Sequence, residues 1–535
     1  MSFVPNPLNE QLSLFNSFQG LTGREKKFLD RSWAKYFSEY IFPKIDEQPY
    51  AVLYSQKDSR PNTPVNIQVG ALLLKELTGL SDDGMVAALM FDVRFQYALH
   101  TTSYLEQPLN DRTLGRFRAR LLAYEEETGI DLIHDTFQKL SAEMSEIMKI
   151  DQSLKRMDSM MVASNIKRMG RLELLYTCVS SLAKEARKSG MELPETLLHY
   201  TEDDDRNRVI YHNRSEETQE KILTVLRDAA VLKDLCATDY AESANYGLLI
   251  RVLKEQAVQN EDGSYRLRTK EDGGMDSSIL QNPADPDATY REKAGKQHRG
   301  YAANLTEACG EDGCSIVTDY QYDTNTHSDA DFIKEAIDSM PGQEGPAVIV
   351  ADGAYSGKAV QEAAAAKNIE VANTNLTGKQ ADDILADFQF SGDGQSVTAC
   401  PAGNAPKSCS YNAKTGQCQV SFHKYDCENC PLKGKCRPKL FKRVAKKTVS
   451  KSGQGRAMQQ RARKTEEFVE RSRFRNGVET LPSIMRRKYG VDRMPVRGLL
   501  PTKLLFGLKI GALNITKFCK YMQGREKCAQ NAAYA

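Results

Sequence analysis

The pattern of apolar and polar positions predicts helices over the first part of the chain. We expect Thr63 to cap a helix that starts at Pro64 and ends at Gly79, Ser81 to cap the next helix, and Asn110 to open a third. Apolar residues recur at helical spacing between these signals. Residues 1–150 are therefore predicted to form an all-helical domain.

Strand-forming runs begin after this region. The segment KRMDSMMVASNI, residues 155–166, is rich in β-branched residues and methionine, and it carries one acid, Asp158, in its middle. An acid inside a strand is unfavourable unless it has a partner or a function. A mostly helical stretch follows from Arg171 to about Asp272, and then two antiparallel strands and a helix are expected. We interpret the helical stretch as an insertion.

A second strand ends at another acid. Residues 347–351 form an apolar run typical of a buried strand, which stops at Asp352. Gly353 permits a turn, Ser356 is expected to cap a helix, and residues 369–376 are expected to be the returning strand. In such βαβ units the reactive crevice lies beyond the carboxyl ends of the strands, where Asp352 is expected. An ordinary turn acid is the alternative.

Composition adds a strong segregation of charge. The 535 residues include 73 Lys and Arg and 71 Asp and Glu, a formal charge of +2. Residues 431–525, however, contain about 26 basic and 5 acidic residues, which favours a polyanionic partner. A solvated basic surface is the alternative. No apolar run reaches the ~18 residues of a membrane helix, and no signal peptide is recognisable, so we expect a cytoplasmic protein.

Cysteines gather in one short segment, between residues 389 and 440. Four of them could supply a closed tetrahedral zinc site, because thiolates are the ligands that structural zinc prefers. Reduced thiols without a metal are the alternative. The four predicted ligands are Cys400, Cys427, Cys430 and Cys436.

Two basic helices carry candidate nucleic-acid contacts. Arg112, Arg116 and Arg120 recur at i, i+4 and i+8 on one face of the third helix and can face phosphates or base edges, although plain surface helices show the same pattern. Further along, Arg471, Arg475 and Glu479 also share a helix face. Arginines orient phosphates and an acid can hold a divalent ion, but a surface ladder of ion pairs would look the same.

Asp158, Asp352 and Glu479 lie on separate predicted elements within a basic surround. Two-metal phosphoryl transfer uses such a set, since carboxylate oxygens hold two Mg²⁺ ions about 4 Å apart. One ion activates the attacking oxygen, and the other stabilises the leaving oxygen.

Three stretches together resemble the signature regions of bacterial insertion-sequence transposases of the DDE type. They are RMDSMMVASNI, VADGAYSG and the late RFRNGVETLPSIMRRKYG. The resemblance implies an α/β RNase H-like catalytic core with large inserted segments and an all-α N-terminal domain. It also implies that Asp158, Asp352 and Glu479 are catalytic and hold two Mg²⁺ or Mn²⁺ ions. The implied partner is double-stranded DNA, at transposon ends and target.

The late signature departs from the family pattern at two positions. Ser472 stands where many members have Tyr, and Arg486, with Lys488 close by, stands where they have Lys. Pro482 also follows Glu479 closely, so we expect the helix to kink or restart there. Three further acids, Glu466, Glu467 and Glu470, are therefore retained as alternatives to Glu479. We expect Arg471, Arg475, Arg486 and Lys488 to contact DNA.

The predicted layout has three parts. Residues 1–150 bind DNA, residues 151–525 form the catalytic domain with insertions at about 168–295 and 390–445, and residues 526–535 are a tail. The predicted function is cutting at insertion-sequence ends and joining the 3′-hydroxyl to target DNA. A Mg²⁺-dependent nuclease and a non-catalytic DNA-binding protein are the alternatives. Family analogy predicts a homodimer or larger oligomer, associated with the bacterial nucleoid and not with a membrane.

Overall fold

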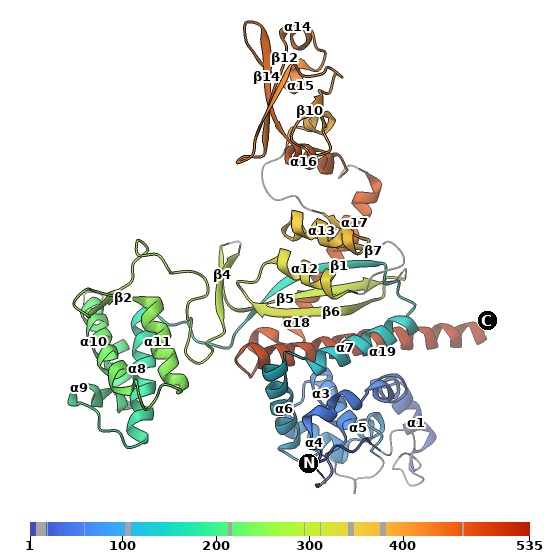
Figure 1. The fold of residues 1–535 in the computed structure, drawn as a ribbon. Helices are drawn as coiled ribbons and strands as arrows, with labels where there is room; N and C mark the ends of the chain where they lie inside the picture. The colour runs from blue at the N-terminus through green and yellow to red at the C-terminus, as the bar shows by residue number, and fades with distance from the viewer. Residues whose placement is uncertain are drawn as a thin grey trace. The chain divides into compact units, whose positions relative to one another are not determined.

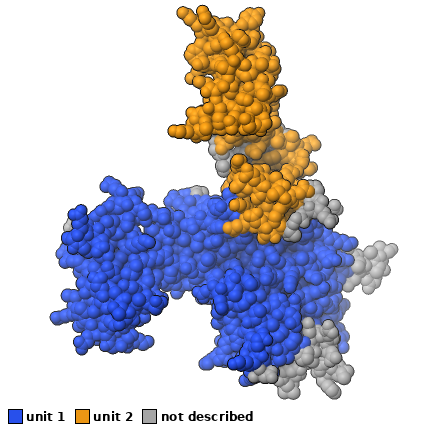
Figure 2. Space-filling view, in the orientation of Figure 1, with its two compact units in different colours: residues 1–152, 159–332, 481–535 blue, residues 153–158, 333–480 orange. Residues whose placement is uncertain are grey.

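The computed structural model describes two compact units of the chain (Figure 2). Unit 1 contains residues 1–152, 159–332 and 481–535, and unit 2 contains residues 153–158 and 333–480. The described residues exclude 7–17, 19, 58, 102–108, 212–216, 294, 311, 341–346, 375–380, 463–464 and 535, and the side chains of 528–534. The fold is mixed α/β with a helical N-terminal region (Figure 1).

The first part of unit 1 is helical, as predicted. Its helices are α1 (Gly23–Asp30), α2 (Trp33–Tyr36), the π-helix η1 (Phe37–Ile41), η2 (Phe42–Lys44), η3 (Gln48–Leu53), α3 (Val65–Thr78), α4 (Asp82–Phe91), α5 (Val93–Ala98), α6 (Thr113–Thr128) and α7 (Leu132–Ile147).

The predicted helix boundaries are partly right. Ser81 caps α4 by accepting a 3.0 Å bond from the Gly84 amide, and Gly79 ends α3 in the left-handed region at φ 73°. Thr63, however, is not the cap of α3, because the helix begins at Val65 and Pro64 takes the cap position. The third helix, α6, begins at Thr113, later than Asn110 indicates.

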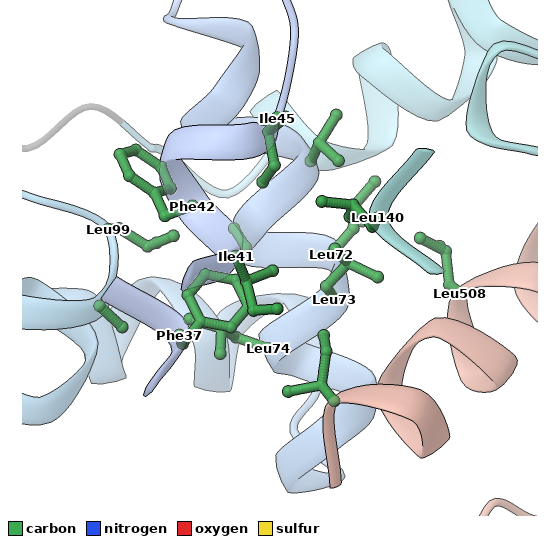
Figure 3. Close-up of a cluster of buried hydrophobic side chains, with 14 of the residues drawn as sticks. Phe37, Ile41, Phe42, Ile45, Leu72, Leu73, Leu74, Leu99, Leu140 and Leu508 are labelled. Carbon is green, nitrogen blue, oxygen red and sulfur yellow. The ribbon is translucent and has the colours of Figure 1, made fainter. Parts of the chain in front are cut away.

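The long C-terminal helix α19 (Leu499–Tyr534) packs on these helices. It contributes Leu504, Leu508, Ile515 and Phe518 to the same buried core as α3. Figure 3 shows side chains of η1, α3, α7 and α19 meeting around Leu72, Leu73 and Leu74. Residues 1–152 therefore share a compact unit with the C-terminal helix, and that helix continues through the segment predicted to be a tail.

The predicted insertion forms a helical module with its own core in unit 1. Leu175, Leu182, Leu226 and Leu249 are fully buried in it. Its elements are α8 (Arg171–Lys188), α9 (Glu195–Leu198), η4 (His199–Thr201), η5 (Asn207–Tyr211), α10 (Thr218–Cys236), α11 (Ala244–Gln256) and the hairpin of β2 (Ala257–Gln259) and β3 (Tyr265–Leu267).

A mixed sheet follows the order β4-β5-β1-β7-β8, and β6 also pairs with β5. Strand β1 (Leu154–Ala163) passes from unit 2 into unit 1 after Asp158. In unit 1, β5 (Lys296–Cys309) is antiparallel to both β4 (Thr289–Lys293) and β6 (Ser315–Thr324). The helix α12 (Asp329–Ser339) comes next. The strand around Asp158, the antiparallel pair and the following helix are thus confirmed.

In unit 2, β1 is parallel to β7 (Ala347–Ala351), and β7 is parallel to β8 (Ile369–Asn373). The 3₁₀ turn η6 (Gly353–Tyr355) and α13 (Lys358–Ala366) connect β7 to β8, which confirms the predicted βαβ unit. The prediction that Ser356 caps α13 is wrong. Its hydroxyl donates to the Gly353 carbonyl at 2.7 Å, and Gly357 takes the cap position.

The cysteine-rich segment of unit 2 is built from short strands around a small core. Its elements are η7 (Asp383–Asp387), β9 (Gln389–Phe390), β10 (Val397–Ala399), β11 (Ser408–Asn412), β12 (Gln417–His423), α14 (Lys424–Glu428), α15 (Lys433–Cys436), β13 (Lys439–Leu440), β14 (Val444–Ser450) and α16 (Lys451–Ala462). The four-stranded sheet is ordered β11-β12-β14-β13. Cys418, Val420 and Phe422 of β12 are buried in the core.

The chain then forms α17 (Glu466–Asn476), the 3₁₀ turn η8 (Gly477–Glu479), α18 (Thr480–Arg487) and η9 (Val491–Arg493) before α19. Among the described residues, no helix is long and apolar enough to cross a membrane.

Candidate active site

The two predicted catalytic aspartates lie on neighbouring parallel strands of unit 2. The register of β1 and β7 pairs Leu154 with Val348 and Arg156 with Val350. The same offset relates Asp158 to Asp352, so continuing the register places the two acids opposite each other. Neighbouring strands are about 4.8 Å apart. The fold therefore brings together two acids that are far apart in sequence.

Asp352 is fixed by its own backbone surroundings. It caps η6, because one carboxylate oxygen accepts a 2.5 Å bond from the Ala354 amide. Its carbonyl accepts a 2.8 Å bond from the side chain of Asn373 on β8. The Asp352 side chain is still 35% exposed, so it is held in place while remaining open to a ligand.

Glu479 lies where the late helical region breaks. The helix α17 ends at Asn476, Glu479 is the last residue of η8, and α18 begins at Thr480. This confirms the predicted restart near Pro482, which falls in the first turn of the new helix. A break is the physical consequence of a proline there, because its ring cannot follow a continuous helix.

One buried guanidinium joins the three predicted acids. Arg475 donates to Glu479 at 2.6 Å and to Asp158 at 3.2 Å, and the same nitrogen that faces Asp158 lies 4.0 Å from an Asp352 oxygen. The Arg475 side chain is only 8% exposed. We call Asp158, Asp352, Glu479 and Arg475 the acid cluster. The structure thus gathers three carboxylates from three elements around one cation.

A divalent metal fits the chemistry of these residues, since Mg²⁺ prefers carboxylate oxygens. As the side chains stand, no group of three or more His, Cys, Asp or Glu among the described residues is placed to hold a metal ion. In the acid cluster the position of Arg475 explains why no metal site is formed, because the carboxylate oxygens face the nitrogens of its guanidinium. A metal would have to replace the guanidinium.

Arg156 and Gly477 position this site, and sequence reasoning missed both. Arg156 donates to the carbonyl of Phe474 at 2.7 Å, and its guanidinium lies 5.3 Å from the centre of the Phe474 ring. A Cβ on Gly477 would come within 2.0 Å of the Arg156 guanidinium. Arg156 thereby ties the end of α17 to β1. Its position two residues before Asp158, on the same strand face, was the available signal.

Other predicted DNA contacts have protein partners. Arg471 pairs with Glu370 of β8 at 2.5 Å and with Glu467 at 2.8 Å. In unit 1, Arg486 pairs with Asp492 at 3.1 Å and donates to the carbonyl of Met161. These contacts give both arginines structural roles, and their contact with DNA stays a prediction.

The remaining predicted DNA contacts differ in their surroundings. Lys488 donates to the Thr516 hydroxyl at 3.2 Å and lies over the ring of Tyr489. Arg112 is exposed at the start of α6, whereas Arg116, one turn later, lines a cavity between α3 and α6.

The four predicted zinc ligands line a common cavity of about 20 Å³ in unit 2. Burial, and to a smaller extent the nearby thiols of Cys436, Cys400 and Cys430, together raise the pKa of Cys427 to about 11. The Cys430 sulfur also accepts a 3.4 Å bond from the Leu432 amide. The four cysteines therefore line one cavity, but as they stand no group of them is placed to hold a metal ion. Zinc binding stays a prediction.

Two family models match the chain, and both describe transposases. The family described as Transposase DDE domain matches residues 399–519, and the family described as Transposase domain (DUF772) matches residues 28–120. The first range contains Glu479 and Arg475, while Asp158 and Asp352 lie outside both ranges. The second range runs from the end of α1 to the middle of α6.

The class of protein that these matches indicate is a transposase, because the chain is similar to transposases in both its helical N-terminal region and its C-terminal part. They further confirm the resemblance to insertion-sequence transposases of the DDE type. No curated protein and no solved structure matches the chain.

Proposed function

We propose that this protein cuts DNA at the ends of an insertion sequence and joins the freed 3′-hydroxyl to target DNA. The two transposase matches support a transposase function in general and DNA as its partner. The specific reaction rests on the acid cluster. An RNase H-like core is supported by the placement of its acids, one within β1, one after the parallel strand β7, and one late in the chain beyond an inserted segment.

The single observation that carries the proposal is the convergence of Asp158, Asp352 and Glu479 on Arg475. Three like charges gathered in one place repel one another unless cations balance them. One guanidinium carries a single positive charge, so the site favours further positive charge. Such carboxylate clusters are typical of sites that hold divalent ions for phosphoryl transfer.

Asp158, Asp352 and Glu479 would hold Mg²⁺ or Mn²⁺. When bound, the metal would supply activation of the attacking oxygen and stabilisation of the leaving oxygen. The protein itself supplies position. Asp352 is fixed by the Ala354 amide, and Arg156 holds the end of α17 against β1.

Arg475 has two uses in this scheme. Without a metal it lies among the carboxylates and reduces their mutual repulsion. If the carboxylates held a divalent ion instead, the Arg475 guanidinium would be free to donate to a phosphate, for which its planar fork is well suited. This is compatible with the prediction that Arg475 contacts DNA.

The test is cleavage of duplex DNA carrying the insertion-sequence end by the wild type, Asp158→Asn and Asp352→Asn. Each amide keeps the side-chain shape but removes the charge. We expect both variants to lose Mg²⁺-dependent cleavage while their DNA affinity stays near that of the wild type. Near-normal cleavage by either variant would overturn the assignment. Nicked products without joined products would favour the nuclease alternative.

A further inference from the structure

A cavity on the surface of unit 1 is lined by basic residues, in contrast to the acid cluster. It has a volume of about 340 Å³, and it is lined by residues 60–64 before α3, by Gln68 of α3, and by one face of α6 from Thr113 to Arg120. Three arginines, Arg60, Arg116 and Arg120, line it. None of its described lining residues is acidic. We call it the basic cavity.

The three arginines differ from most arginines discussed above. Within the described part of the chain, no ion pair links Arg60, Arg116 or Arg120 to a carboxylate. By contrast, Arg118 on the same helix pairs with Asp82. Concentrated positive charge without internal partners is unfavourable and favours an anionic ligand.

The remaining lining groups suit the same ligand. Asn62 and Asn110 present side-chain amides that can donate hydrogen bonds, whereas the Thr113 hydroxyl already donates to Asn110 Oδ1 at 3.0 Å. The helices α3 and α6 begin at the cavity, and neither has a side-chain cap at its N-terminus. The positive end of each helix dipole adds to the charge of the arginines.

The cavity is also partly organised in advance. The Arg120 guanidinium lies 5.0 Å from the centre of the Tyr54 ring, a contact that restrains it. Gln68 is buried, and it holds Tyr54 by donating to its hydroxyl at 3.2 Å. A restrained guanidinium loses less conformational freedom when a ligand binds.

We propose that Arg60, Arg116 and Arg120 bind a backbone phosphate of duplex DNA. The choice of DNA as the polyanion rests on the proposed function. A recessed cavity suits a phosphate better than a base edge, because base edges are read by side chains that project into a groove. The helix pattern left open whether Arg116 contacts phosphates or base edges. We assign it to the phosphates of the DNA backbone.

The test is a titration of the full chain with two short duplexes of unrelated sequence, over a series of salt concentrations. Arg116→Ala, Arg120→Ala and Arg60→Ala should each reduce the slope of log affinity against log salt by about one. The loss should be the same on both duplexes. Arg120→Lys should retain most of the slope, because a positive charge remains.

Arg24→Ala is the matched control. Arg24 is an exposed arginine on α1 that lies over the ring of Phe28 and outside the cavity, so its removal should leave the slope unchanged. Thermal unfolding of each variant verifies that it is folded. Arg116 is exposed at the surface of α6, so Arg116→Ala remains informative if Arg120→Ala unfolds.

The outcomes separate this inference from the proposed function. If the wild type cleaves DNA but the cavity variants keep the wild-type slope, the inference is overturned and the proposed function stands. If the slopes fall as expected but Asp352→Asn cleaves normally, the cavity assignment stands and the catalytic assignment fails. A wild type without salt-dependent DNA binding would overturn the cavity assignment, and a loss on one duplex alone would point to base recognition.

Discussion

The acid cluster and the basic cavity use arginine in opposite ways. In unit 2, Arg475 is buried and faces three carboxylates. In unit 1, Arg60, Arg116 and Arg120 line an open cavity without an acidic lining residue. In the acid cluster, carboxylates of the protein balance the positive charge of Arg475. In the basic cavity, the positive charges of the arginines remain available to an anionic partner. The comparison teaches that arginines with the same charge differ in how available they are to a partner, because internal carboxylates already engage Arg475 but not the arginines of the basic cavity.

The largest effect is expected at the acid cluster. Glu479→Gln should reduce the rate of DNA cleavage by at least about 100-fold. Mutating residues that only hydrogen-bond to metal ligands already lowers metal affinity or activity by about 10- to 100-fold, and a ligand itself should have a larger effect. Glu470→Gln is the matched control, since Glu470 is exposed on α17. Cleavage rates in Mg²⁺ measure both variants. If Glu470→Gln is the inactive one, the third acid has been assigned to the wrong residue.

The cavity lined by the four predicted zinc ligands offers a third environment for comparison, in which thiols lie beside the two lysines Lys433 and Lys447. We predict one zinc ion per chain in the wild type, and its loss in Cys427→Ser together with destabilisation of the segment around β12. Elemental analysis and thermal unfolding measure this. Cys178→Ser, in the separate core of the inserted helices, should leave the zinc content unchanged. Wild-type protein without zinc would refute the prediction.

Removing the cation of the acid cluster should destabilise the protein by about 2 kcal/mol. Breaking a buried ion pair costs more than this, but the carboxylates here are partly exposed and solvent screens them. Arg475→Gln should therefore lower the free energy of unfolding measured in urea. Adding Mn²⁺ should raise the stability of this variant more than it raises that of the wild type. Arg473→Gln, at an exposed position of α17, is the control. Equal stability of the two variants would contradict the central place given to Arg475.

The smallest effect is expected at the contact that positions the cluster. Gly477→Ala should shift the Arg156 guanidinium and reduce cleavage by about 10-fold, a cost of about 1.4 kcal/mol. The shift falls on the flexible end of Arg156, so the protein should stay folded. Gly434→Ala, where a Cβ meets no atom within 4 Å, is the control. An unchanged rate in Gly477→Ala would mean that Arg156 does not hold the site.

Local chemistry made much of the site predictable. The apolar run before Asp352 and the lone acid in the strand around Asp158 were visible because strands bury alternate or continuous apolar residues. The register that places these acids opposite each other was not, since pairing between distant strands leaves no local pattern. Pro482 predicted a break in the helix near Glu479, and the break lies at η8. It did not predict that Arg475 would contact all three acids.

Other features depended on contacts that only the fold provides. The helix that carries Arg116 and Arg120 was predictable, although Arg112 precedes it at the cap position. The periodicity could not tell which of these arginines line a cavity or that Arg60 joins them. Similarly, the glutamate that pairs with Arg471, Glu370, lies on a strand distant in sequence. Charge along the chain indicates a polyanion, but partners across the fold decide which basic residues are available to it.

The most direct test of the acid cluster is a calorimetric titration of Mn²⁺ into the protein bound to duplex DNA. The wild type should bind Mn²⁺, and Asp158→Asn combined with Asp352→Asn should lose this binding while still binding DNA. Equal Mn²⁺ binding by the wild type and the double variant would contradict the claim that these carboxylates form the metal-dependent active site.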